Sequence, residues 1–170
     1  MHGFAMKSLV VWLIYSIFSV SPAAAEIVES TIIDAPMSIV RTILEPAQSA
    51  AYLSPDVLNA EVEAENDCTI VHIEADGGPL GDITYSALRC PTPKGWREQL
   101  VSSTTIEEYA YNVSLEPITN VQTRVTIRSH IRLRASVPNK LIDRGVRRSV
   151  RKTLERLSGR ALNKYGRYGQ

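Results

Sequence analysis

The fold is decided by residues 123–162, TRVTIRSHIRLRASVPNKLIDRGVRRSVRKTLERLSGRAL, in which a strand pattern changes into a helix pattern. Between residues 124 and 134 the side chains alternate between two faces, and Ser129 shares the apolar face. The apolar face carries Val125, Ile127, Ile131 and Leu133, and the polar face carries Arg124, Thr126, Arg128, His130, Arg132 and Arg134. Alternation of this kind is typical of a strand with one buried face, so we predict a half-buried β-strand here.

After Pro138 the spacing between apolar residues changes to three and four. These residues are Ile142, Val146, Val150, Leu154, Leu157 and Ala161. The spacing places them in one stripe along an amphipathic helix. Ser136 suits the N-cap of this helix, and Pro138 suits its first turn. A curved sheet that grips a long helix can leave space for an apolar ligand, so this junction bears on function as well as on fold.

The N-terminus has the pattern of a secretory signal peptide. A positive start ends at Lys7, an apolar run covers residues 8–20, and small residues occupy positions 23–25. The run of 13 residues is shorter than the roughly 20 that a membrane-spanning helix needs, which disfavours an uncleaved anchor. We therefore expect cleavage before Glu26 and a periplasmic or secreted protein. One ligand-binding domain should cover residues 26–162, with a flexible basic tail over residues 163–170.

The two cysteines, Cys68 and Cys90, are predicted to form a disulfide. Export implies an oxidising compartment, in which a disulfide is the usual state of paired cysteines. Residues 69–74 and 83–89 read as strands around a turn-rich segment, residues 76–82, which contains the midpoint between the cysteines. In a symmetric hairpin the two cysteines face each other. The alternative is a redox or metal pair, but the chain has neither a Cys-x-x-Cys spacing nor a nearby histidine cluster to support it.

Charge is divided unevenly along the chain. Residues 137–170 hold ten basic and two acidic residues, a net charge of +8, whereas residues 26–136 have a net charge of −8. The favoured interpretation is that sheet and helix neutralise each other. The alternative is that the helix also contacts an anionic membrane surface. Its contact residues would be Arg147, Arg148, Arg151 and Lys152. No aromatic-rich basic strand suggests a nucleic-acid partner, and we expect a monomer.

The remaining elements predict an α+β protein. A strand over residues 27–33 precedes two short helices, the first capped by Asp34 with Pro36 in its first turn. Further strands are expected near residues 57–65, 69–74, 83–89, 96–103 and 107–115. Short turns between neighbouring strands favour antiparallel pairing. We predict a curved antiparallel sheet of about six to seven strands wrapped around the long C-terminal helix.

This element order, together with three local motifs, resembles the START-like superfamily of helix-grip proteins, which includes polyketide cyclases and coenzyme-Q-binding proteins. The first motif is a strand running into Ala-Pro and then a short apolar helix. The motif residues here are Ile32, Ile33, Asp34, Ala35, Pro36 and Val40, with Arg41 where the family often has an aromatic residue. The second motif is Tyr52, Pro55 and Val57. The third, residues 122–126, matches a Gly-Thr-Arg-Val-Thr-like run in four of five places.

The resemblance covers residues 26–162 and implies a cavity between sheet and helix for a lipid, sterol, quinone or polyketide-like molecule. The signal peptide and the cysteine pair are unusual for the family and indicate an exported variant. We expect the cavity to be lined by Val71, Ile73, Tyr85, Ala87, Tyr109, Tyr111, Val113, Ile127, Ile131, Val146, Val150 and Leu154. The alternative is a closed core. The tyrosines favour a pocket, because a buried phenol needs a hydrogen-bond partner.

No motif for catalysis, for a metal site or for a cofactor is found, so we predict none of the three. By alternation His72 should face solvent beside Glu74, and His130 should also point outward. The outward arginines of residues 124–134 are expected to pair with Glu98, Glu107 and Glu108. A binding module is the first hypothesis. A cyclase-like or dehydratase-like enzyme using a tyrosine or Glu98 as acid is the second. A structural protein with a filled core is the third.

Overall fold

A computed structural model describes residues 26–168. The predicted signal peptide lies outside these residues, and its cleavage stays a prediction. The strands are β1 (Ile27–Ile33), β2 (Val57–Glu65), β3 (Cys68–Asp76), β4 (Asp82–Thr92), β5 (Gly95–Ser103), β6 (Ile106–Thr119) and β7 (Gln122–Leu133). The helices are α1 (Met37–Leu44), α2 (Ser49–Leu53) and α3 (Asn139–Tyr168), with one 3-10 turn, η1 (Gly78–Leu80). The predicted α+β class and element order are confirmed.

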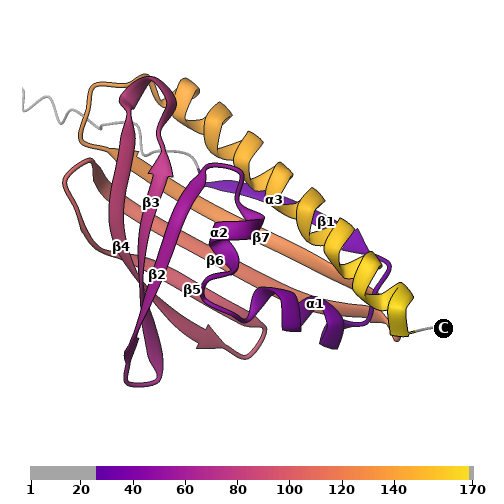
Figure 1. Cartoon of the computed structure of the whole chain (residues 1–170). Coiled ribbons are helices and arrows are strands. Elements are labelled where there is room, and N and C mark those ends of the chain that lie inside the picture. Colours follow the sequence, from indigo (N-terminus) through magenta and orange to yellow (C-terminus); the bar gives the residue numbers. More distant parts are fainter. Residues whose placement is uncertain (1–25, 169–170) are drawn as a thin grey trace, which may run out of the picture.

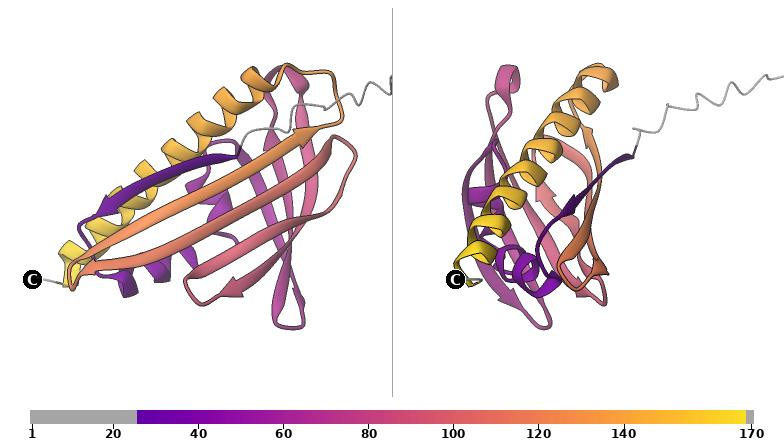
Figure 2. Two further views of the ribbon diagram at one scale, coloured as in Figure 1. Left: turned by 180° about the vertical axis from the view of Figure 1, so that it is seen from behind. Right: turned by 90° about the vertical axis from the view of Figure 1, so that its right-hand side faces the viewer.

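All seven strands form one antiparallel sheet in the order β1-β7-β6-β5-β4-β3-β2. The first strand therefore pairs with the last, while α1 and α2 carry the chain across to the opposite edge (Figure 1). The sheet curves, so that β2, β3 and β4 stand on one side of α3 and β6, β7 and β1 stand on the other (Figure 2). The concave face of the sheet is thus the face that can hold both the core and a ligand.

Helix α3 packs along β1 and β7 and over α1 and α2. Four residues of its predicted stripe, Val150, Leu154, Leu157 and Ala161, are buried at 5% exposure or less, whereas Ile142 and Val146 are partly buried. Two details of the prediction are wrong. The helix begins at Asn139, with the N–H of Leu141 donating to the Pro138 carbonyl over 2.9 Å, so Ser136 is not its N-cap. It also continues to Tyr168, so residues 163–168, predicted as a tail, are helical.

Helix α1 starts differently from the sequence prediction. Pro36 occupies the N-cap position, and no side chain caps the helix. The carboxylate of Asp34, the predicted cap, instead accepts a hydrogen bond of 2.7 Å from Gln122 Nε2, which ties the end of β1 to the start of β7. The prediction for Asp34 was wrong because a distant partner competes with the local cap. Val40, Ile43 and Leu44 of α1 are buried as expected.

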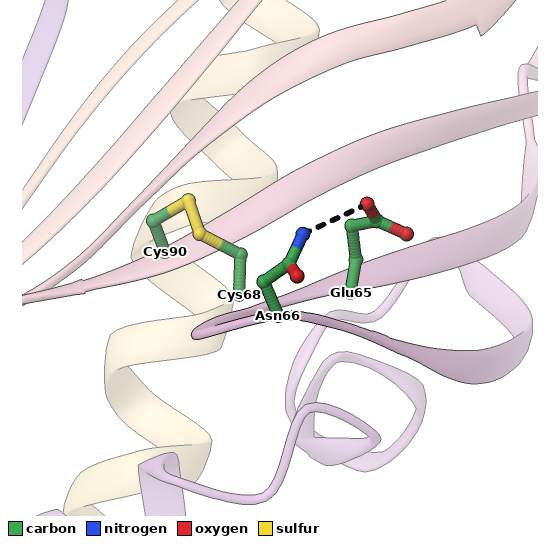
Figure 3. Close-up of a disulfide and its surroundings, with 4 residues drawn as sticks. All are labelled: Glu65, Asn66, Cys68 and Cys90. Carbon is green, nitrogen blue, oxygen red and sulfur yellow. Dashed lines mark hydrogen bonds between the residues drawn. A yellow bond between two sulfur atoms is a disulfide. The ribbon is translucent and has the colours of Figure 1, made fainter.

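The predicted disulfide between Cys68 and Cys90 is confirmed. Thr69 lies opposite Arg89 in the β3–β4 ladder, which places the two cysteines opposite each other at the hairpin end. Their Cα atoms are 4.4 Å apart (Figure 3). Beside them, the turn from β2 to β3 contains Asn66 at φ 52°, a left-handed conformation that asparagine tolerates well. The disulfide therefore fastens the far end of the β3–β4 hairpin.

Candidate functional site

The inner face of the sheet brings the predicted cavity residues together in two apolar clusters. The first lies under α3 and contains Val113, Ile127, Val150 and Leu154, with Val146 packed against it. The second lies further along the sheet and contains Ala87 and Tyr109, with Tyr85 and Ile131 packed against it. Tyr111 contacts both clusters. Val71 and Ile73 are also buried, at 0% and 4% exposure. The predicted cavity residues thus lie on the inner face of the sheet and on the side of α3 that packs against it. Their role in binding stays a prediction.

Three tyrosines form a row on this inner face. The ring centroids of Tyr85 and Tyr109 are 5.1 Å apart, and those of Tyr109 and Tyr111 are 6.4 Å apart with nearly parallel planes. Burial raises the pKa of each phenol, and the negative charge of Glu98 raises it further. The three hydroxyls therefore stay protonated at neutral pH, and that of Tyr109 donates a hydrogen bond to Glu98.

The tyrosine row adjoins a buried ion pair between β4 and β5. Arg89 and Glu98 lie directly opposite each other in the ladder, both on the inner face. Arg89 Nε donates to Glu98 Oε1 over 2.8 Å, and the two side chains are only 10% and 5% exposed. The Tyr109 hydroxyl donates to the other oxygen, Oε2, over 2.7 Å. Both oxygens of Glu98 are thereby hydrogen-bonded, as a buried carboxylate requires.

The loop between α1 and α2 covers this polar cluster from the helix side. Arg89 Nη1 donates to the Pro46 carbonyl over 3.3 Å, and the guanidinium carbon lies 4.5 Å from the ring centroid of Trp96. Two donors are left over. Trp96 Nε1 is buried without a hydrogen-bond partner, and Arg89 Nη2 has none among the described residues. The cluster can therefore donate to one further acceptor, such as a ligand oxygen.

Sequence reasoning missed Arg89 and Trp96 as site residues. A usable signal was present, because Arg89 follows Tyr85 and Ala87 at the strand period of two and so shares their inner face. Trp96 and Glu98 share a face for the same reason. The expectation that Glu98 pairs with the outward arginines was wrong, since Glu98 faces inward to Arg89.

Both His72 and His130 lie on the outer face of the sheet, as predicted. His72 is exposed, with Nδ1 at 2.8 Å from Ser86 Oγ, and His130 lies 2.9 Å from Glu108 Oε2. Outward arginines pair with neighbouring carboxylates: Arg124 with Glu116, Arg128 with Glu26, and Arg132 with Glu107 and Glu108. These ion pairs give the outward arginines a structural role on the outer face. Over residues 26–168 no group of three or more His, Cys, Asp or Glu side chains is placed to hold a metal ion.

Two of the four predicted membrane-contact residues form ion pairs within the fold. Arg147 Nη1 lies 2.6 Å from Glu29 Oε1, and Arg151 Nε lies 3.1 Å from Glu29 Oε2. Arg148 is exposed, and Lys152 is partly buried. In the part of the chain that the structure describes, no helix is long and apolar enough to cross a membrane.

Two hollows open at the surface of the described chain. The first, of about 470 Å³, is lined by residues of β2 to β5, among them His72, Glu74 and Tyr85. The second, of about 720 Å³, lies between α1, α2 and the C-terminal half of α3. Neither is lined by Arg89, Glu98 or Trp96. The polar cluster therefore lies outside both hollows.

Comparison with known proteins identifies the fold. No family model and no curated protein matches the sequence. Among solved structures, a START superfamily protein from Mycobacterium smegmatis superimposes with a TM-score of 0.71 at 11% identity, covering 81% of this chain and 97% of that one. The Zhui aromatase/cyclase from a Streptomyces species gives a TM-score of 0.66 at 12% identity, covering 86% and 96%. A protein from Thermus thermophilus gives 0.72 at 17% identity, covering 82% and 99%. Agreement over nearly the whole domain shows that this chain has the START-like helix-grip fold.

Proposed function

We propose that this protein is an exported carrier that binds a hydrophobic small molecule between the curved sheet and α3. The observation that supports the proposal is Trp96 Nε1, which is buried beside the Arg89–Glu98 pair without a hydrogen-bond partner among the described residues. A buried donor without a partner costs about 1–3 kcal/mol. A carbonyl or hydroxyl oxygen of a ligand placed there removes that cost, so the ligand gains affinity from a single polar end.

The apolar part of the ligand would lie along the second cluster. Six inner-face side chains there keep part of their surface exposed: Ile83, Tyr85, Leu100, Tyr111, Ile131 and Leu133. Partly exposed apolar surface on a concave face gains free energy when a ligand covers it, about 25 cal/mol per Å². The tyrosine row also offers flat faces on which a ring system can stack. Lipids, sterols, quinones and polyketide-like molecules with one oxygen-bearing end fit this arrangement.

Export is supported by the disulfide and by the N-terminal sequence pattern. Disulfides persist in the periplasm and outside the cell, whereas cytosolic thiols are kept reduced. A carrier in such a compartment would sequester or move an apolar molecule across an aqueous space.

Native mass spectrometry with solvent extraction, on protein purified from its own host, tests the carrier function. We expect a reproducible bound mass in the wild type and its loss in Arg89→Met/Glu98→Leu, which removes both charges while keeping apolar volume. Arg97→Met is the matched control, because Arg97 lies on the outer face of β5 opposite Cys90. A wild-type protein that is empty and takes up no lipid, sterol or quinone would refute the proposal.

A cyclase-like or dehydratase-like enzyme is the second candidate. The 2.7 Å hydrogen bond from Tyr109 to Glu98 favours it, because a proton can pass between the phenol and the carboxylate. The similarity to an aromatase/cyclase shows the fold and adds no residue roles. The variants Tyr85→Phe, Tyr109→Phe and Tyr111→Phe separate the two functions. A carrier keeps its ligand in all three variants, whereas an enzyme that uses one of these hydroxyls loses turnover in that variant while still binding the ligand.

A further inference from the structure

The second hollow is a basic cleft, far along α3 from the predicted membrane-contact residues. Its lining comes from three helices: Thr42 and Ile43 of α1, Tyr52 of α2, and Arg160, Asn163, Lys164 and Arg167 of α3. Residues 160, 164 and 167 follow the helical spacing of four and three, so they share one face of α3. Three cations thus line one side of a hollow of about 720 Å³.

Contacts with α1 and α2 hold two of these cations in place. Lys164 Nζ donates to Thr42 Oγ1 over 2.7 Å. The guanidinium carbon of Arg160 lies 4.7 Å from the ring centroid of Tyr52, and the Tyr52 hydroxyl donates to the Ile43 carbonyl over 2.7 Å, which fixes the ring. The cleft therefore has a defined geometry.

The described residues do not neutralise the positive charge of the cleft. Over residues 26–168, no carboxylate lies within ion-pair distance of Arg160, Lys164 or Arg167. No acidic residue lines the hollow either. In the N-terminal half of the same helix, Arg147 and Arg151 are paired with Glu29, whereas the exposed Arg144 and Arg148 also have no carboxylate partner among the described residues. The cleft differs from that half because its three cations line one hollow between three helices. A favourable interaction with the helix dipole accounts for the position of Arg167 in the last turn of α3. It does not account for Arg160, which lies two turns earlier.

We propose that the basic cleft binds a phosphate group. Arg160, Lys164 and Arg167 supply charge-assisted donors, and the Asn163 amide supplies a neutral one, which suits a doubly charged tetrahedral anion better than a single carboxylate. Ile43 and the Tyr52 ring form an apolar side of the hollow, against which the carbon part of a phosphate ester lies. The site is separate from the inner polar cluster, and its test does not depend on a ligand bound there.

A nuclear magnetic resonance titration of the purified protein with inorganic phosphate, at constant ionic strength, tests the site. We expect saturable shifts confined to residues 42–44, 52 and 160–167. In Arg160→Gln/Arg167→Gln the dissociation constant should rise about tenfold or more, as the loss of two charge-assisted contacts implies. Arg167→Gln alone should weaken binding by a smaller factor without disturbing the fold, since Arg167 is exposed and donates no hydrogen bond to another described residue.

Arg144→Gln/Arg148→Gln is the matched control, because it removes the same charge from exposed positions of the same helix outside the cleft. The control should bind phosphate as the wild type does. Absence of saturable shifts, or equal weakening in both double variants, would overturn the proposal, because binding would then reflect net charge alone.

Vesicle flotation identifies the source of the phosphate. The vesicles contain phosphatidylcholine with or without phosphatidic acid, whose phosphate is a monoester like the anion that the cleft suits. A lipid headgroup is established if, besides the phosphate shifts, the wild type and the Arg144→Gln/Arg148→Gln control float with the anionic vesicles and Arg160→Gln/Arg167→Gln does not. Phosphate shifts without cleft-dependent flotation establish a free phosphate compound.

Discussion

At the scale of single residues, Arg89 and Glu98 form the one ion pair among the described residues in which both side chains are 10% exposed or less. Two charges removed from water repay their desolvation only when both are paired and hydrogen-bonded. Here Glu98 accepts bonds from Arg89 and Tyr109, while Arg89 also reaches the Pro46 carbonyl. The pair therefore links β4 and β5 to β6 and to the α1–α2 loop, and both partners are needed for that link.

We expect Glu98→Gln to destabilise the protein by about 3–5 kcal/mol, because it leaves the buried Arg89 charge without a counter-charge. The double variant Arg89→Met/Glu98→Leu should recover most of this loss, since no buried charge then remains. Urea denaturation of wild type, Arg89→Met, Glu98→Leu and the double variant measures the coupling. Additive losses in the double variant would show that the two groups are not coupled.

At the scale of elements, α3 is anchored to β1 through Glu29. Burial alone would raise the pKa of Glu29, but hydrogen bonds and charge from Arg151 and Arg147 outweigh it and lower the pKa below the ordinary 4.5. A carboxyl with a lowered folded-state pKa contributes stability above its unfolded-state pKa, and that stability is lost as the pH falls through the folded-state value.

Glu29→Gln should therefore cost about 1–2 kcal/mol at pH 7, and the difference from wild type should shrink once the pH falls below about 4.5. Urea denaturation at several pH values measures it. Glu26→Gln is the control with the same charge change, because Glu26 pairs with Arg128 at 3.5 Å and is 54% exposed. An exposed pair of that kind contributes about 0–1 kcal/mol. If Glu29→Gln lost the same amount of stability at pH 3 and at pH 7, the contribution of Glu29 would not come from its charge.

The disulfide is the second link between elements. It closes a loop over a sequence separation of 22 residues, which the chain-entropy model equates with about 3 kcal/mol. We expect Cys68→Ser/Cys90→Ser to lose about that much stability, and a reductant to produce the same loss in the wild type. Thermal unfolding with and without reductant measures both. A melting temperature that the reductant leaves unchanged would show that the bond constrains nothing.

The elements also show where sequence reasoning succeeds and where it ends. Alternation and helical spacing are local properties, so they predicted the strand of residues 124–134, the buried stripe of α3 and the cysteine hairpin. Helix ends were predicted less well, because the caps depend on distant partners such as Gln122, which binds Asp34. The ion pair of Arg89 and Glu98 depends on the register between two strands, which no single strand pattern contains.

At the scale of the whole molecule, the two sides of the curved sheet differ in how they are held. On one side, β1 and β7 pack on α3, and β1, β6 and β7 contribute Ile33, Val113, Leu115, Val125 and Ile127 to the first apolar cluster. On the other side, β2 is an edge strand without a fully buried residue, and it carries Glu61, Glu63 and Glu65. Charged residues on an edge strand oppose aggregation, but they contribute little to packing. Strand β2 is therefore held mainly by backbone pairing, whereas β3 and β4 also bury Val71, Ile73 and Ala87 and are joined by the disulfide.

Hydrogen exchange should resolve this difference. We expect amides of β2 to exchange through local openings of low free energy, those of β3 and β4 next, and those of β6, β7 and the C-terminal half of α3 only with global unfolding. Reduction of the disulfide should speed exchange in β2 to β4 while leaving β7 unchanged, because the constraint that it removes lies within the β3–β4 hairpin. Arg89 lies on β4, so opening of this side also uncovers the polar cluster. If the amides of all seven strands exchanged with the same opening free energy, the two sides of the sheet would not differ in stability and the sheet would open as a single unit.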